Sequence, residues 1–188
     1  MLEGFDLWAN PSSPHGPGRK ARNALEDARA RIAAALGWPG EVLFTSGASE
    51  AAALALGRAK GGARLVSAVE HEAVLRAAPA AERLPVRADG SLAVEGLDEA
   101  LDRERPLVAL QQVNSETGSA FDFDNLAERV HAAGGWLLVD ASQAAGKQPL
   151  PPAADMAIVS AHKFGGPVGL GALLVRDLAM LEPAGGQE

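Results

Sequence analysis

Three groups of polar residues could do chemistry, because each directly follows a short apolar segment. The first is the run of small residues Thr45-Ser46-Gly47-Ala48-Ser49-Glu50. A turn of this kind at the start of a helix offers free backbone N–H groups and the positive end of the helix dipole to an anion. Ser49 could add a hydroxyl donor, or it could simply cap the helix. The turn therefore predicts either a phosphate site or an ordinary helix cap.

A carboxylate and a lysine follow two later apolar segments. Asp140 comes after residues 136–139, and Lys163 comes after residues 156–160. Burying a carboxylate is costly unless a cation pairs with it, and a pyridinium nitrogen is one such cation. A loop-organising role for Asp140 is the alternative. Partial burial of Lys163 in a cleft would favour the uncharged amine that forms imines, whereas a surface lysine in a glycine-rich loop is the simpler interpretation.

Two further side chains complete the set. His71 follows residues 65–69 and could present a flat ring to a flat cofactor, although a lone histidine is also common as a structural residue. Gln143 could donate to a phenolic oxygen or only satisfy a loop. A phosphate turn, a flat ring, an acid for a pyridine nitrogen and a lysine follow one another along the chain. Together they predict a pyridoxal 5′-phosphate site with Lys163 as the point of covalent attachment.

The elements that must position these groups alternate between helix and strand. A long helix is expected to present Leu25, Ala28, Ile32 and Leu36 on one face and to end at Gly37, after an ordered loop over residues 10–18. Such alternation predicts an α/β fold with a mainly parallel sheet covered by helices on both faces, and ligands bind at the carboxyl ends of such strands. The expected strands are 42–44, 65–69, 84–87, 91–93, 107–113, 136–139, 156–160 and 172–175, and the expected further helices are 50–59, 72–78, 97–103 and 125–133.

The composition is that of a globular domain. The chain has 188 residues, 47% of them hydrophobic, and a formal net charge of −7. It contains no cysteine, so disulfides and thiolate metal sites within it are excluded. No basic block, signal peptide or membrane-length apolar stretch stands out, so we expect a cytoplasmic protein that binds neither nucleic acid nor membrane.

Six motifs in order along the chain resemble those of the cysteine desulfurases (NifS/IscS type) of the class V aminotransferase superfamily. The resemblance extends over nearly the whole sequence. The motifs are Asn10-Pro11-Ser12-Ser13-Pro14-His15, Thr45-Ser46-Gly47-Ala48-Ser49-Glu50, Glu70-His71-Glu72-Ala73-Val74, Asn114-Ser115-Glu116-Thr117-Gly118, Asp140-Ala141-Ser142-Gln143 with Gly146-Lys147, and Ser160-Ala161-His162-Lys163 with Gly165-Gly166-Pro167.

The resemblance implies the large domain of a fold-type-I enzyme that acts as a homodimer. It implies that Lys163 binds pyridoxal 5′-phosphate covalently and that Lys163 and His71 are the catalytic residues. His71 would stack on the pyridine ring, Asp140 would pair with its nitrogen and Gln143 would contact its hydroxyl. The remaining residues would hold the phosphate or contact cofactor and substrate. The implied cofactor-binding set is Ala48, Ser49, His71, Ser115, Asp140, Gln143, Ser160, His162 and Lys163.

The implied reaction converts L-cysteine to L-alanine and transfers the sulfur to an enzyme persulfide for iron–sulfur cluster assembly, with a scaffold or sulfur-acceptor protein as partner. Two departures accompany it. Ser115 stands where the family usually has a second asparagine, and the cysteine-free chain carries no nucleophile for the sulfur. Residues 1–188 are therefore expected to be a single, incomplete cofactor-binding large domain, without the N-terminal segment and the C-terminal small domain. The alternatives are another class V enzyme, a selenocysteine lyase or an aminotransferase, or a non-catalytic fragment or half of a split enzyme.

Overall fold

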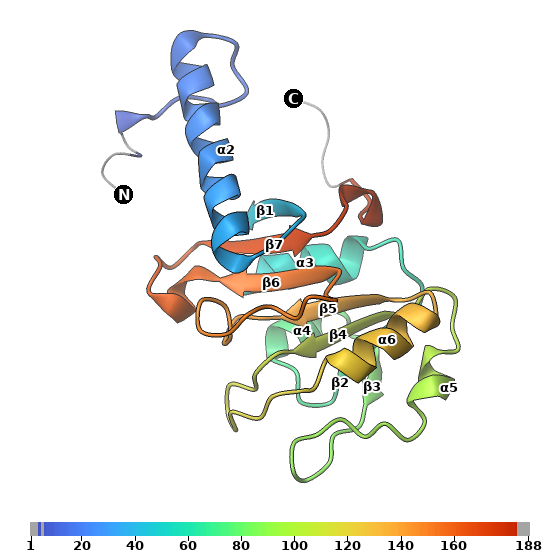
Figure 1. The fold of residues 1–188 in the computed structure, drawn as a ribbon. Helices are drawn as coiled ribbons and strands as arrows, with labels where there is room; N and C mark the ends of the chain where they lie inside the picture. The colour runs from blue at the N-terminus through green and yellow to red at the C-terminus, as the bar shows by residue number, and fades with distance from the viewer. Residues whose placement is uncertain (1–3, 5, 184–188) are drawn as a thin grey trace.

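The structure, a computed structural model, describes residue 4 and residues 6–183 and is built on one seven-stranded sheet (Figure 1). The strands lie in the order β1-β7-β6-β5-β4-β2-β3. Their bounds are β1 Glu41–Thr45, β2 Arg64–Ser67, β3 Glu82–Leu84, β4 Leu107–Gln111, β5 Trp136–Asp140, β6 Met156–Ser160 and β7 Gly171–Val175.

The sheet is mostly parallel, which confirms the expected α/β class. Only β7 runs against its neighbours, and it pairs antiparallel with both β1 and β6. Apolar runs in a sequence do not reveal this direction, but the connection does, because residues 161–170 are too few for the helical crossover that a parallel strand needs. The carboxyl ends of the six other strands consequently share one edge of the sheet with the amino end of β7.

Helices cover both faces of the sheet. One apolar cluster joins α3 and α4 to one face, and a second joins α5, α6 and the last turns of α2 to the other. The two faces alternate along each strand as the pleat requires, so that Val108 packs in one cluster and Leu107 in the other. The helices are α2 Gly16–Leu36, α3 Ala48–Arg58, α4 Glu72–Ala77, α5 Leu97–Leu101 and α6 Asp124–Ala132, with 3₁₀ turns η1 Ala161–Phe164 and η2 Leu178–Met180.

Helix α2 starts earlier than expected and extends away from the sheet (Figure 1). The loop expected through residue 18 ends at His15, whose Nδ1 accepts a hydrogen bond of 3.0 Å from Gly18 N. A glycine is needed at position 18, because a Cβ there would lie 2.4 Å from the Ser13 carbonyl oxygen. The helix ends at Gly37, as expected, in a left-handed cap. No helix in the described part of the chain is long and apolar enough to span a membrane.

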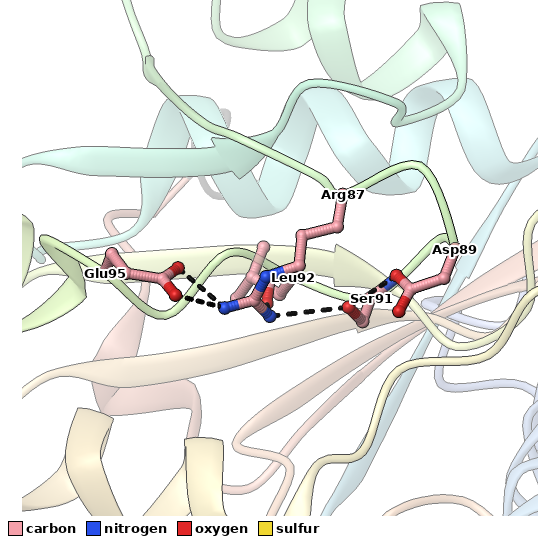
Figure 2. Close-up of polar contacts among 5 residues, drawn as sticks. All are labelled: Arg87, Asp89, Ser91, Leu92 and Glu95. Carbon is pink, nitrogen blue, oxygen red and sulfur yellow. Dashed lines mark hydrogen bonds and ion pairs between the residues drawn. The ribbon is translucent and has the colours of Figure 1, made fainter.

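The hairpin expected over residues 84–93 forms only in part (Figure 2). Its regular pairing is a single bridge between Val86 and Leu92, and the strand of this region is β3, which lies earlier and pairs in parallel with β2. Backbone bonds from Arg87 N to the Ser91 carbonyl, at 2.8 Å, and from Ala93 N to the Pro85 carbonyl, at 2.9 Å, flank this bridge. The Arg87 side chain also donates to both carboxylate oxygens of Glu95, at 2.5 and 2.7 Å, and to the Leu92 carbonyl at 2.9 Å. The expectation of two strands here was therefore wrong.

Candidate active site

A cleft of about 570 Å³ lies at the sheet edge where the parallel strands end. All nine residues of the predicted cofactor-binding set line it, although they come from segments that lie far apart in the sequence. Asp140 and Ser160 are buried, Ala48 and Gln143 are half-buried, and the other members are exposed. The geometry thus brings the whole predicted set together, while the role of each residue stays a prediction.

The turn between β1 and α3 leaves backbone donors free at one side of the cleft. The first helical hydrogen bond of α3 runs from Ala51 N to Gly47 O at 3.2 Å, so the N–H groups of the preceding residues have no helical acceptor. Gly47 has φ 152° and ψ −177°, in the range where glycine is favoured over residues with a Cβ. The Thr45 hydroxyl donates to the Gly47 carbonyl at 3.0 Å and fixes the turn.

One of these donors already has a partner. Ser46 N–H donates to Glu50 Oε2 at 2.6 Å, and this bond lowers the pKa of the exposed Glu50 carboxyl. The Glu50 carboxylate therefore caps the start of its own helix, α3. The N–H groups of Ala48 and Ser49 remain for an anion in the cleft.

Strand β7 supports this turn from below. Gly171 pairs with Thr45 of β1 and with Ser160 of β6. A Cβ at position 171 would lie 2.7 Å from Gly47 Cα and 2.8 Å from the Val159 carbonyl oxygen. The absence of a side chain at Gly171 is what allows the turn between β1 and α3 to lie directly on the strand.

Asp140 ends β5 and forms the floor of the cleft. Its side chain is 9% exposed, and Oδ1 accepts a hydrogen bond of 2.9 Å from Ser142 N. The Ser142 hydroxyl is buried and has no hydrogen-bond partner among the described residues. Gln143 faces the same cleft, while its carbonyl accepts from Lys147 Nζ at 2.9 Å. A buried carboxylate and a free hydroxyl point to a polar ligand that completes this floor.

The end of β6 carries a serine, a histidine and the predicted lysine. Ser160 is 1% exposed, and its Oγ lies 3.0 Å from His162 Nδ1. Lys163 lies on η1 and lines the cleft, but its side chain is exposed, so the partial burial expected for it is not found. The loop that follows is also exposed, with Val168 at 81%.

His71 and Ser115 form the opposite wall. The strand expected to end at residue 69 ends at Ser67, and His71 instead caps α4, its Nδ1 accepting from Ala73 N at 3.1 Å. Ser115 lies in a turn held by Asn114, whose Oδ1 accepts from Glu116 N at 2.8 Å. The Ser115 side chain is exposed to the cleft.

Three polar residues of this region were missed by the sequence interpretation. Gln111 and Ser142 line the cleft, and Glu70 lies buried beside it. Gln111 carried a signal, because it is a polar residue inside the apolar run 107–113. Glu70 carried none, because an acid next to a histidine near the surface is ordinary in a turn.

Fold and cleft together combine an open helix start after β1, a buried acid at the end of β5 and a lysine after β6. The family model "Aminotransferase class-V" matches residues 5–187, and the chain belongs to this enzyme family.

Within the family, the chain is similar to proteins named cysteine desulfurases. It is 40% identical to a cysteine desulfurase of Frankia sp. (strain EuIK1), over 97% of this chain and 51% of that protein. The solved structure of a NifS-like protein from Rickettsia africae ESF-5 matches 93% of this chain and 52% of its own, with a TM-score of 0.83 and 29% identity. A structure of SspA in complex with cysteine matches 97% of this chain and 59% of its own, with a TM-score of 0.85 and 31% identity. The chain thus spans about half the length of the relatives it matches, and its fold is that of the NifS-like, fold-type-I proteins.

Proposed function

We propose that the cleft binds pyridoxal 5′-phosphate and that the chain contributes this site to a cysteine desulfurase. The observation that carries the proposal is the convergence of nine residues, chosen from the sequence alone, on one cleft. The similarity to cysteine desulfurases and to a structure that holds cysteine supports L-cysteine, or a related amino acid, as substrate.

The residues present fit the cofactor. The N–H groups of Ala48 and Ser49 offer a site for the phosphate at the start of α3, with Ser160 and His162 beside it. Asp140 is a buried carboxylate that lacks a cationic partner among the described residues, and a protonated pyridine nitrogen would supply one. His71, Gln143 and Ser115 line the same cleft and would contact the ring and the substrate.

The roles of the chain's own side chains follow from this placement. Lys163 would hold the cofactor covalently and, once the substrate amine has replaced it, would move the proton of the substrate α-carbon. Asp140 would keep the ring nitrogen protonated, and His71 would hold the ring plane. When bound, the cofactor supplies an electron sink for the bonds of that carbon.

The sulfur-accepting step requires a group outside these residues. The sequence contains no cysteine, so the persulfide that takes sulfur from the substrate must form elsewhere than in residues 1–188. We propose further that these residues form a single, incomplete large domain, that the working enzyme is a cytoplasmic homodimer, and that the sulfur passes to a scaffold or acceptor protein for iron–sulfur cluster assembly.

The attachment of the cofactor tests the proposal directly. The chain is incubated with pyridoxal 5′-phosphate, reduced with borohydride and mapped by peptide mass spectrometry. We expect the adduct on Lys163. Lys147 provides the matched control, because it is an exposed lysine that lies near the cleft but donates to the Gln143 carbonyl. Lys163→Arg should abolish the adduct and Lys147→Arg should leave it, and an adduct that persists in Lys163→Arg would refute the assignment.

A further inference from the structure

Glu70 is a buried acid that the proposed reaction does not use. Its side chain is 5% exposed and lies between the ends of β2 and β4. One carboxyl oxygen, Oε1, accepts from the Ser67 hydroxyl at the end of β2 and from Gln111 N at the end of β4, the latter at 3.0 Å. The side chain therefore joins two neighbouring strands at the edge where the cleft opens.

The same segment is tied to β4 a second time. The Val69 carbonyl accepts from Gln111 Nε2 at 2.8 Å and from Asn114 Nδ2 at 3.2 Å. These bonds and those of Glu70 leave little freedom to the turn that leads from β2 into α4. His71, the next residue after Glu70, is the N-cap of α4 and lines the cleft.

The second oxygen of Glu70 is buried without a hydrogen-bond partner among the described residues. Burial raises the pKa of Glu70 to about 8, the two hydrogen bonds lower it, and the nearby Asp140 charge raises it further. A pKa of about 8 favours the uncharged form of Glu70 at neutral pH.

We propose that Glu70 is a positioning residue, which fixes the turn that carries His71 against the end of β4. Its acceptor oxygen does the fixing, and a negative charge is not required. The inference rests on the proposed function only in what His71 would contact, namely the cofactor ring.

The test compares Glu70→Met with Glu70→Gln in the 188-residue chain. Methionine keeps a side chain of similar size and removes the acceptor for Ser67 and Gln111, whereas glutamine keeps a neutral acceptor. In Glu70→Met we expect amide hydrogen exchange in residues 68–73, measured without cofactor, to rise at least about fivefold, the effect of losing a buried hydrogen-bonded tie. Glu70→Gln should stay close to the wild type.

A matched control makes the same change at a surface position. Glu82→Met on the edge strand β3, where the Glu82 side chain makes an exposed ion pair of 3.9 Å with Arg103, should leave exchange in 68–73 unaltered. Ser67→Ala removes one of the two hydrogen-bond donors to Glu70 and tests the role of Glu70 if Glu70→Met does not fold. It should raise amide hydrogen exchange in residues 68–73. Unchanged exchange in a folded Glu70→Met, or in Ser67→Ala, would overturn the inference. Equal acceleration in Glu70→Gln would overturn it as well.

A second readout connects the turn to the cofactor. The affinity for pyridoxal 5′-phosphate, followed by absorbance, should fall about tenfold in Glu70→Met, because a misplaced His71 would lose its contact with the ring. In Glu70→Gln the affinity should equal that of the wild type. If the wild-type chain binds no cofactor, the proposed function fails, and the exchange experiment still decides the role of Glu70.

Discussion

Asp140 and Glu70 place two carboxyl groups beneath one cleft in different surroundings. Asp140 lines the cleft and accepts a hydrogen bond from a backbone N–H, whereas Glu70 is buried and has one oxygen without a hydrogen-bond partner among the described residues. Asp140 could be predicted from the sequence because it directly ends an apolar strand. Glu70 could not, because its burial arises from the bonds to Ser67 and Gln111, and the partner β4 lies about forty residues away.

The protonation of Glu70 gives a pH dependence of a definite sign. Its pKa is about 8 in the folded chain against an ordinary value of 4.5, so the contribution of Glu70 to stability is full below 4.5 and is lost as the pH rises through 8. At about 1.4 kcal/mol per pKa unit the loss amounts to a few kcal/mol. We expect Glu70→Gln to match the wild type near pH 5 and to become the more stable protein near pH 9, as measured by denaturant unfolding.

An exposed acid provides the contrast to this prediction. The pKa of Glu95 is lowered, first by its own backbone N–H and then by the hydrogen bond from Arg87 (Figure 2). The contribution of Glu95 to the stability of the fold is therefore present at neutral pH and is lost on acidification. Glu95→Gln should show no gain over the wild type as the pH rises. A stability gap in Glu70→Gln that stays constant with pH would contradict the raised pKa.

At the scale of the elements, hydrophobic patterning predicted where most helices and strands lie. It did not predict how the strands meet. The apolar run of β7 is the same in either direction, and only the short connection from β6 forces the antiparallel pairing. The hairpin expected over 84–93 is limited to one bridge, between Val86 and Leu92, and Leu84 pairs with Ser67 of β2. The mainly parallel sheet was predicted correctly, whereas the partner of each strand depends on residues far away in the sequence, which local patterns do not encode.

The contact between β7 and the turn that joins β1 to α3 predicts how a methyl group at position 171 changes the stability of the fold. Gly171→Ala would place a Cβ 2.7 Å from Gly47 Cα, against backbone that cannot move without shifting the start of α3. We expect a destabilisation of about 1–3 kcal/mol, typical of overpacking. Thermal unfolding of the purified chain measures it.

Gly57→Ala is the matched control for this substitution. Gly57 lies within α3, and a Cβ there meets no atom within 4 Å. Alanine should therefore stabilise the helix by about 0.5–1 kcal/mol. If Gly171→Ala were as stable as Gly57→Ala, the close approach of the turn to β7 would be wrong.

At the scale of the whole molecule, the chain holds all the residues chosen for the cofactor and none for accepting sulfur. The family membership could be predicted from six motifs, five of which contribute residues to the cleft, whereas the sixth, residues 10–15, precedes α2. What remains a proposal is the activity of the complete protein, since the chain spans about half of its relatives. Beside the cleft, the apolar side chains of Phe164, Val168 and Leu170 are exposed, and contact between apolar surface and water is unfavourable.

The absence of cysteine predicts the behaviour of the chain with its proposed substrate. We expect the chain, supplied with pyridoxal 5′-phosphate and L-cysteine but with no other thiol, to release no sulfide beyond free cofactor at the same concentration. The cysteine desulfurase of Frankia sp. serves as the positive control. Sulfide release above the free-cofactor level would show that sulfur can leave without an enzyme cysteine.

Strand β1 has a consequence for the order in which the chain folds. In the described part of the chain its only strand partner is β7, which comes last among the described strands along the sequence. During synthesis, the backbone groups of β1 must therefore stay without their strand partner until residues 171–175 have emerged from the ribosome. Closing so long a loop is slow and leaves an unprotected strand edge for that time. A nascent chain from which residues 171–175 have not yet emerged should thus have β1 unpaired and the turn between β1 and α3 still unformed.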